Sequence, residues 1–74
     1  MMSRNSVLDY IKNKELGSDG IVKISLYIMR LLLESRDDYS VIRFKFLIAK
    51  ALKKGISDPT LFNIYKDMIE FIGD

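Results

Sequence analysis

The feature that most constrains this chain is the amount of apolar surface that so few residues must bury. Hydrophobic residues fill 49% of the 74 positions, and only two of them, Ala49 and Ala51, are alanine. A chain of this size buries only about 60% of the surface that its unfolded form exposes, so its core is marginal. Short chains compensate with disulfides, a metal ion or oligomerisation. Because Cys and His are both absent, oligomerisation is the route we expect.

The spacing of the apolar residues predicts four helices, at about 6–16, 19–35, 38–54 and 58–72. The second and third segments also alternate every two residues, around Ile24 and Phe44, as strands do. A helical projection of the second segment gathers one narrow polar stripe, which we interpret as its solvent face: Lys23, Tyr27, Arg30 and Glu34. The third segment continues into FLIAKALKKG, which favours a helix. We therefore predict an all-α domain over 1–74, either a compact four-helix bundle or an orthogonal helical array, with dimerisation to complete it.

Residues that favour helix ends lie between these segments. Asp58 before Pro59 is the clearest N-cap, because proline suits the first helical position. The other expected N-caps are Asn5 or Ser6, Ser18 or Asp19, and one of the pair Asp37 and Asp38. Each of Gly17, Gly55 and Gly73 follows a helical segment and is predicted to be a left-handed C-cap residue.

The sequence offers little that could support catalysis. Without His, no side chain is the usual base for a serine nucleophile, and no lysine is marked as a buried partner for a serine. The segment ELGSDG lacks the glycine spacing of a phosphate-binding loop. We expect no enzyme, no cofactor and no metal site.

Two surfaces are candidates for binding. The third helix gathers a basic face, Arg43, Lys50, Lys53 and Lys54, which could meet an acidic partner or nucleic acid, or could be a solvated helix face. The second helix has an apolar arc too wide for one small core, and it supplies a candidate dimer or partner face: Ile24, Ile28, Leu31 and Leu32. The remaining large side chains are interpreted as core, including Phe44, Phe46, Phe62, Phe71 and Met68, with Tyr10, Tyr27, Tyr39 and Tyr65 half-buried.

A helix-turn-helix at about 47–66 is the alternative interpretation. The motif's small residue, turn glycine and buried aliphatics are matched by Ala51, Gly55, Ile56, Leu61 and Ile64. Against it, Lys50 and Lys54 stand where the motif usually has apolar residues. The would-be recognition helix also carries Asp67 and Glu70, which repel phosphate.

No segment is typical of a secretory signal, and the most apolar stretch, 21–33, is shorter than the roughly 20 residues that span a membrane. We expect a soluble, cytoplasmic protein. Its excess of Ile and Lys over Ala, Pro and Gly suggests an AT-rich source such as a phage, a virus or a low-GC bacterium. The leading hypothesis is a non-enzymatic protein–protein interaction module, a small regulator, adaptor or inhibitor that forms a homodimer. The alternative is a small DNA-binding regulator.

Overall fold

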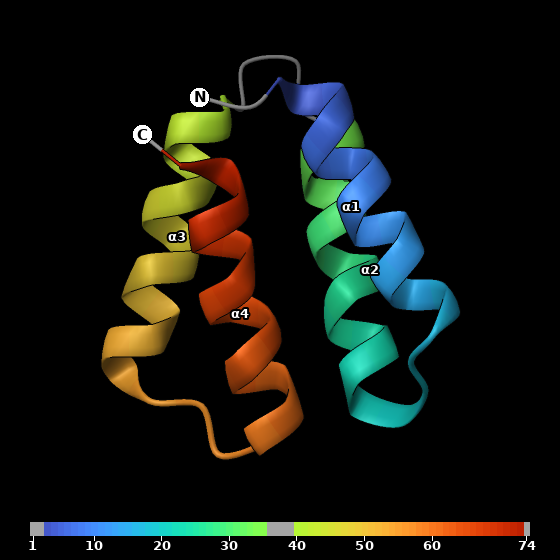
Figure 1. Ribbon diagram of the computed structural model, residues 1–74, viewed down its shortest axis with the longest axis vertical. Helices are drawn as coiled ribbons and strands as arrows, with labels where there is room; N and C mark the ends of the chain where they lie inside the picture. Colours follow the sequence, from blue (N-terminus) through green and yellow to red (C-terminus); the bar gives the residue numbers. More distant parts are fainter. Residues whose placement is uncertain (1–2, 36–39, 74) are drawn as a thin grey trace.

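The computed structural model describes residues 3–35 and 40–73, which form four α-helices and no strand. The helices are α1 (Arg4–Leu16), α2 (Gly20–Ser35), α3 (Val41–Lys54) and α4 (Pro59–Ile72). Consecutive helices run in opposite directions (Figure 1), so they form an up-and-down bundle rather than an orthogonal array. The prediction of a compact all-α fold of four helices is confirmed, and the alternating segments around Ile24 and Phe44 are helical.

The bundle consists of two helical hairpins. α1 packs along α2, and α3 packs along α4. The hairpins meet where the ring of Tyr10 on α1 stacks on Phe71 of α4, with ring centroids 4.4 Å apart. In Figure 1, α1 and α4 lie nearer to the viewer and α2 and α3 lie behind them, so the outer surfaces of α2 and α3 share one side of the molecule.

All four helices contribute to the core at helical spacing. The buried apolar residues are Val7, Ile11, Val22, Leu26, Met29, Leu33, Val41, Phe44, Ile48, Leu61, Ile64, Met68 and Ile72. Phe44 is the largest fully buried side chain. The prediction that Phe46 also belongs to the core was wrong, because 70% of this residue is exposed. Two positions along an α-helix correspond to about 200° of rotation, which places Phe46 on the side opposite Phe44.

The N-caps of α1 and α3 differ from the predicted ones. Ser3 caps α1 by accepting a hydrogen bond from the backbone N–H of Ser6 at 3.2 Å, so the predicted caps Asn5 and Ser6 lie inside the helix. Ser40 caps α3 in the same way, and α3 therefore begins three residues later than predicted. The other predicted candidates, Asp37 and Asp38, lie outside the described residues, as does Tyr39.

The α4 cap and two of the three glycine predictions are confirmed. An oxygen of Asp58 accepts a hydrogen bond from the Leu61 N–H at 2.9 Å, with proline at the first helical position. Gly55 and Gly73 have positive φ angles of 102° and 70° at the C-terminal ends of α3 and α4. Gly17 was predicted wrongly, because its φ is −94°. The positive φ near this end of the hairpin is instead at Gly20, the first residue of α2.

Candidate interaction surface

The outer face of α2 is apolar along its whole length. Ile21, Ile24, Ile28 and Leu31 follow one another at spacings of three, four and three residues and are all exposed, Ile24 by 61% and Ile28 by 59%. We call these four residues the α2 seam. They lie opposite the residues that α2 buries in the core, since the two sets are half a helical turn apart. The helix is therefore apolar on two opposite sides, and only one of them is covered.

The predicted apolar face overlaps the α2 seam but is not identical to it. Ile24, Ile28 and Leu31 are exposed as predicted, whereas Leu32 is half-buried and faces a groove between α2 and α3. Ile21, which was not among the predicted residues, extends the seam toward the start of α2. Its spacing to Ile24 and Ile28 was visible in the sequence and could have identified it.

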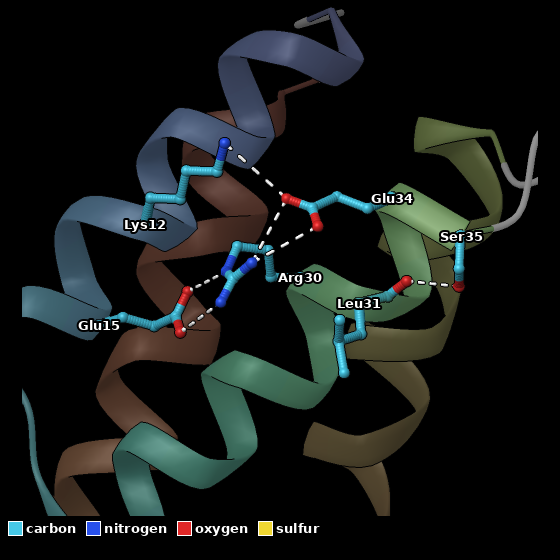
Figure 2. Close-up of polar contacts among 6 residues, drawn as sticks. All are labelled: Lys12, Glu15, Arg30, Leu31, Glu34 and Ser35. Atoms are coloured by element: carbon cyan, nitrogen blue, oxygen red, sulfur yellow. Dashed lines mark hydrogen bonds and ion pairs between the residues drawn. The ribbon is translucent and has the colours of Figure 1, made fainter.

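Three of the four residues in the polar stripe of α2 are exposed, and the fourth, Arg30, is half-buried against α1. The Arg30 side chain donates from Nε to Glu15 Oε2 at 2.6 Å and from Nη2 to Glu15 Oε1 at 3.3 Å (Figure 2). Arg30 Nη1 also lies 3.4 Å from Glu34 Oε2, and Nζ of Lys12 on α1 lies 3.8 Å from Glu34 Oε1. The hydrogen bonds to Glu15 raise the pKa of Arg30, with the nearby carboxylate charges adding to the effect. The predicted solvent face is thus exposed at Lys23, Tyr27 and Glu34, whereas only 25% of the Arg30 side chain is exposed.

Glu15 is an acidic residue in an otherwise apolar set of buried side chains. It is 9% exposed and lies in the last turn of α1. A buried carboxylate is costly unless it is paired and hydrogen-bonded. Arg30 meets that requirement from the neighbouring helix, so the pair fixes how α2 lies against α1.

A groove of about 440 Å³ runs between α2 and α3. Its α2 wall includes Ile28 and Leu32, its α3 wall includes Leu47 and Ala51, and Met29 and Ile48 lie at its base. Among the residues that the structure describes, the charged ones that line it are Lys50 and Lys54, and no acidic side chain does so. The groove is thus apolar along its length and positive along its α3 rim.

The predicted basic residues Arg43, Lys50, Lys53 and Lys54 are all exposed on α3. α3 contains no Asp or Glu, so nothing within the helix neutralises them. Phe46 projects from the same side, which the sequence interpretation missed because it assigned this residue to the core. Lys45 lies off this face and donates a hydrogen bond to the Gly73 carbonyl. The basic face is therefore mixed, with an exposed aromatic ring among the cations.

The exposed large apolar residues are concentrated on the α2–α3 side of the molecule. Within residues 3–35 and 40–73, eight of nine lie on these two helices, and the ninth, Leu16, ends α1. No member of this set lies on α4. A small domain rarely leaves such a patch uncovered unless it serves binding.

Two features bear on metal binding and on titration. Within residues 3–35 and 40–73, no three His, Cys, Asp or Glu side chains are grouped closely enough to hold a metal ion. Burial raises the pKa of both Tyr10 and Tyr65, and the charge of Asp67 raises that of Tyr10 further, so these phenols stay neutral at ordinary pH. No helix in the described part of the chain is long and apolar enough to cross a membrane.

The segment proposed as a helix-turn-helix is an antiparallel hairpin. α3 and α4 lie side by side and point in opposite directions (Figure 1), whereas the two helices of a DNA-binding helix-turn-helix cross at about 90–120°. The outer face of α4, which would have to read the bases, carries Asp67 and Glu70 in exposed positions. This arrangement gives no support to the motif.

Compared with known proteins, the chain matches no family model, no curated protein and no solved structure at a significant level.

Proposed function

We propose that this protein is a non-enzymatic protein–protein interaction module that self-associates through the α2 seam. Such a module acts as a small regulator, adaptor or inhibitor. The observation that carries the proposal is the exposed row of Ile21, Ile24, Ile28 and Leu31 on the side of α2 that faces away from the core. Apolar residues that repeat every three and four positions are the pattern by which helices pair.

The spacing of the seam favours an antiparallel pair of α2 helices. Steps of three, four and three residues read the same in both directions. In an antiparallel pair with the two-fold axis level with Leu26, Ile21 of one copy meets Leu31 of the second, and Ile24 meets Ile28. Every seam residue then has an apolar partner, as an isologous interface requires.

The expected dimer is weak. Full burial of an aliphatic side chain contributes about 1.5–3 kcal/mol, and roughly half of each seam side chain remains to be buried, so each contributes about 1 kcal/mol. Eight such side chains in a dimer contribute about 8 kcal/mol, from which the cost of association, at least about 4 kcal/mol, must be subtracted. At most about 4 kcal/mol remains, so a dissociation constant of about one millimolar or weaker follows, and the dimer should form only as the protein concentration rises from micromolar into the millimolar range.

Self-association is tested by measuring mass with light scattering across this concentration range. Wild type should change from monomer to dimer, and Ile24→Glu should remain a monomer, because each dimer would bury two carboxylates against apolar side chains. Leu16→Glu is the matched control, since Leu16 is an exposed leucine outside the seam and its replacement should leave the dimer intact. Far-UV circular dichroism should show that both variants keep their helices.

The antiparallel arrangement is tested with cysteines, which the natural chain lacks. An equal mixture of Ile24→Cys and Ile28→Cys should form mixed disulfides under mild oxidation, and each variant alone should form few. Efficient cross-linking of each variant with itself would indicate a parallel pair instead. Wild type that stays monomeric at every concentration would overturn the proposal of self-association.

A further inference from the structure

The groove between α2 and α3 has the shape of a helix-binding site. Its walls are two antiparallel helices, and the lining residues recur along each wall at helical spacing, with Ile28 and Leu32 on α2 and Leu47 and Ala51 on α3. The base is already filled by Met29 and Ile48, which are buried. A helix laid in such a groove inserts side chains from positions i, i+3, i+4 and i+7.

The charged residues of the groove are both lysines, and both lie on its α3 side. Lys50 and Lys54 stand one turn apart on the α3 rim, and neither makes an ion pair with any residue in the described part of the chain. By contrast, Arg30 and Lys12, on the α1–α2 side of the molecule, already pair with Glu15 and Glu34. The rim therefore presents two positive charges, in a row, beside an apolar floor.

From this geometry we propose that the groove binds an acidic amphipathic helix of a partner protein. The apolar stripe of that helix packs against Leu32, Leu47 and Ala51, and carboxylates one turn apart on its flank lie against Lys50 and Lys54. This inference rests on the proposed role as an interaction module but not on self-association. Ile28 lines both surfaces, whereas Leu47, Lys50 and Lys54 lie outside the α2 seam, so the two proposals can fail separately.

The test is a selection from a display library of short randomised helical peptides, made on immobilised wild type and on Ile24→Glu. Both proteins should enrich peptides with an apolar helical stripe flanked by Asp or Glu. A selected peptide, labelled and titrated by fluorescence anisotropy, should bind Lys50→Glu/Lys54→Glu about tenfold more weakly, since each exposed charge pair contributes modestly. Leu47→Glu should remove binding.

Lys53→Glu is the matched control. Lys53 is an equally exposed lysine on α3 that does not line the groove, and its reversal should change affinity less than twofold. Binding should also weaken as salt is raised, because the pairs are exposed.

Several outcomes would overturn the inference. Enriched peptides that are neutral or basic, an absence of enrichment, or equal affinity for the double charge reversal would each exclude an acidic helix. The same variants are tested on vesicles of phosphatidylserine and phosphatidylcholine and on random-sequence duplex DNA. Tighter binding to either, dependent on Lys50 and Lys54 but not on Leu47, would assign the lysines to a lipid or nucleic-acid surface instead.

Discussion

Phe44 and Phe46 provide a direct test of how α3 is oriented, because they are two residues apart and have opposite environments. Phe44 is fully buried, whereas Phe46 is 70% exposed. Replacing a buried phenylalanine by alanine costs about 3–5 kcal/mol, from lost burial and the cavity that remains. At Phe46 there is little buried surface to lose, so Phe46→Ala should change the free energy of unfolding by less than about 0.5 kcal/mol.

The cost of Phe44→Ala is large relative to the free energy of unfolding of the whole protein. A chain of this length has a free energy of unfolding of about 4–11 kcal/mol, so Phe44→Ala removes about a quarter of it or more. At about 4–8 °C per kcal/mol, the melting temperature should fall by at least about 12 °C, against less than about 4 °C for Phe46→Ala. If Phe44→Ala does not fold, Phe44→Leu should retain the fold and cost about 1–1.5 kcal/mol.

Thermal and urea unfolding, followed by far-UV circular dichroism, measure the difference. The chain has no Trp, so tryptophan fluorescence offers no alternative signal. Low micromolar protein keeps a second copy from covering Phe46. Equal losses of stability for Phe44→Ala and Phe46→Ala would refute the helical phase of α3. Residues two positions apart on a strand point to the same face, so in a strand the two substitutions would have similar effects.

Three further predictions concern single structural features, each measured as the change in urea midpoint or melting temperature. Asp58→Ala should cost about 0.5–2 kcal/mol through loss of the α4 N-cap, and an unchanged midpoint would mean that the helix is capped otherwise. Gly55→Ala should cost about 1–3 kcal/mol, because φ is 102° there, whereas Gly17→Ala, at φ −94°, should be tolerated. Glu15→Gln should lower the melting temperature more than Lys12→Ala does, since the ion pair of Glu15 is short and mostly buried and that of Lys12 is long and exposed; equal effects would contradict this.

Helix number and type could be predicted from the sequence because polar and apolar residues keep a helical period over many turns. In α2 the polar stripe that includes Lys23, Arg30 and Glu34 outweighed the shorter strand-like alternation. The start of α3 could not be placed in the same way. Several polar residues precede it, and any of them could have capped it, whereas the structure uses Ser40.

The side of each helix that faces the core was harder to predict than the helix itself. α2 is apolar on two sides, so periodicity alone does not say which side is buried. On α3, Phe46 was assigned inward because a phenylalanine usually is, and only its angular distance from Phe44 places it among the lysines. The exposure of the basic residues was easier to predict, because charged side chains almost always lie at the surface.

Because α2 is apolar on two sides, the ion pair of Glu15 and Arg30 also bears on which side of the helix is buried. A helix with two apolar sides can roll about its axis and pack with either one inward, which gives the chain two competing arrangements of similar hydrophobic gain. Rolling α2 over would carry Arg30 away from α1 and leave the Glu15 carboxylate without its cation. The ion pair thus favours one rotation of α2 about its axis, in which Leu26 and its neighbours in the core are buried and the α2 seam is exposed to other molecules.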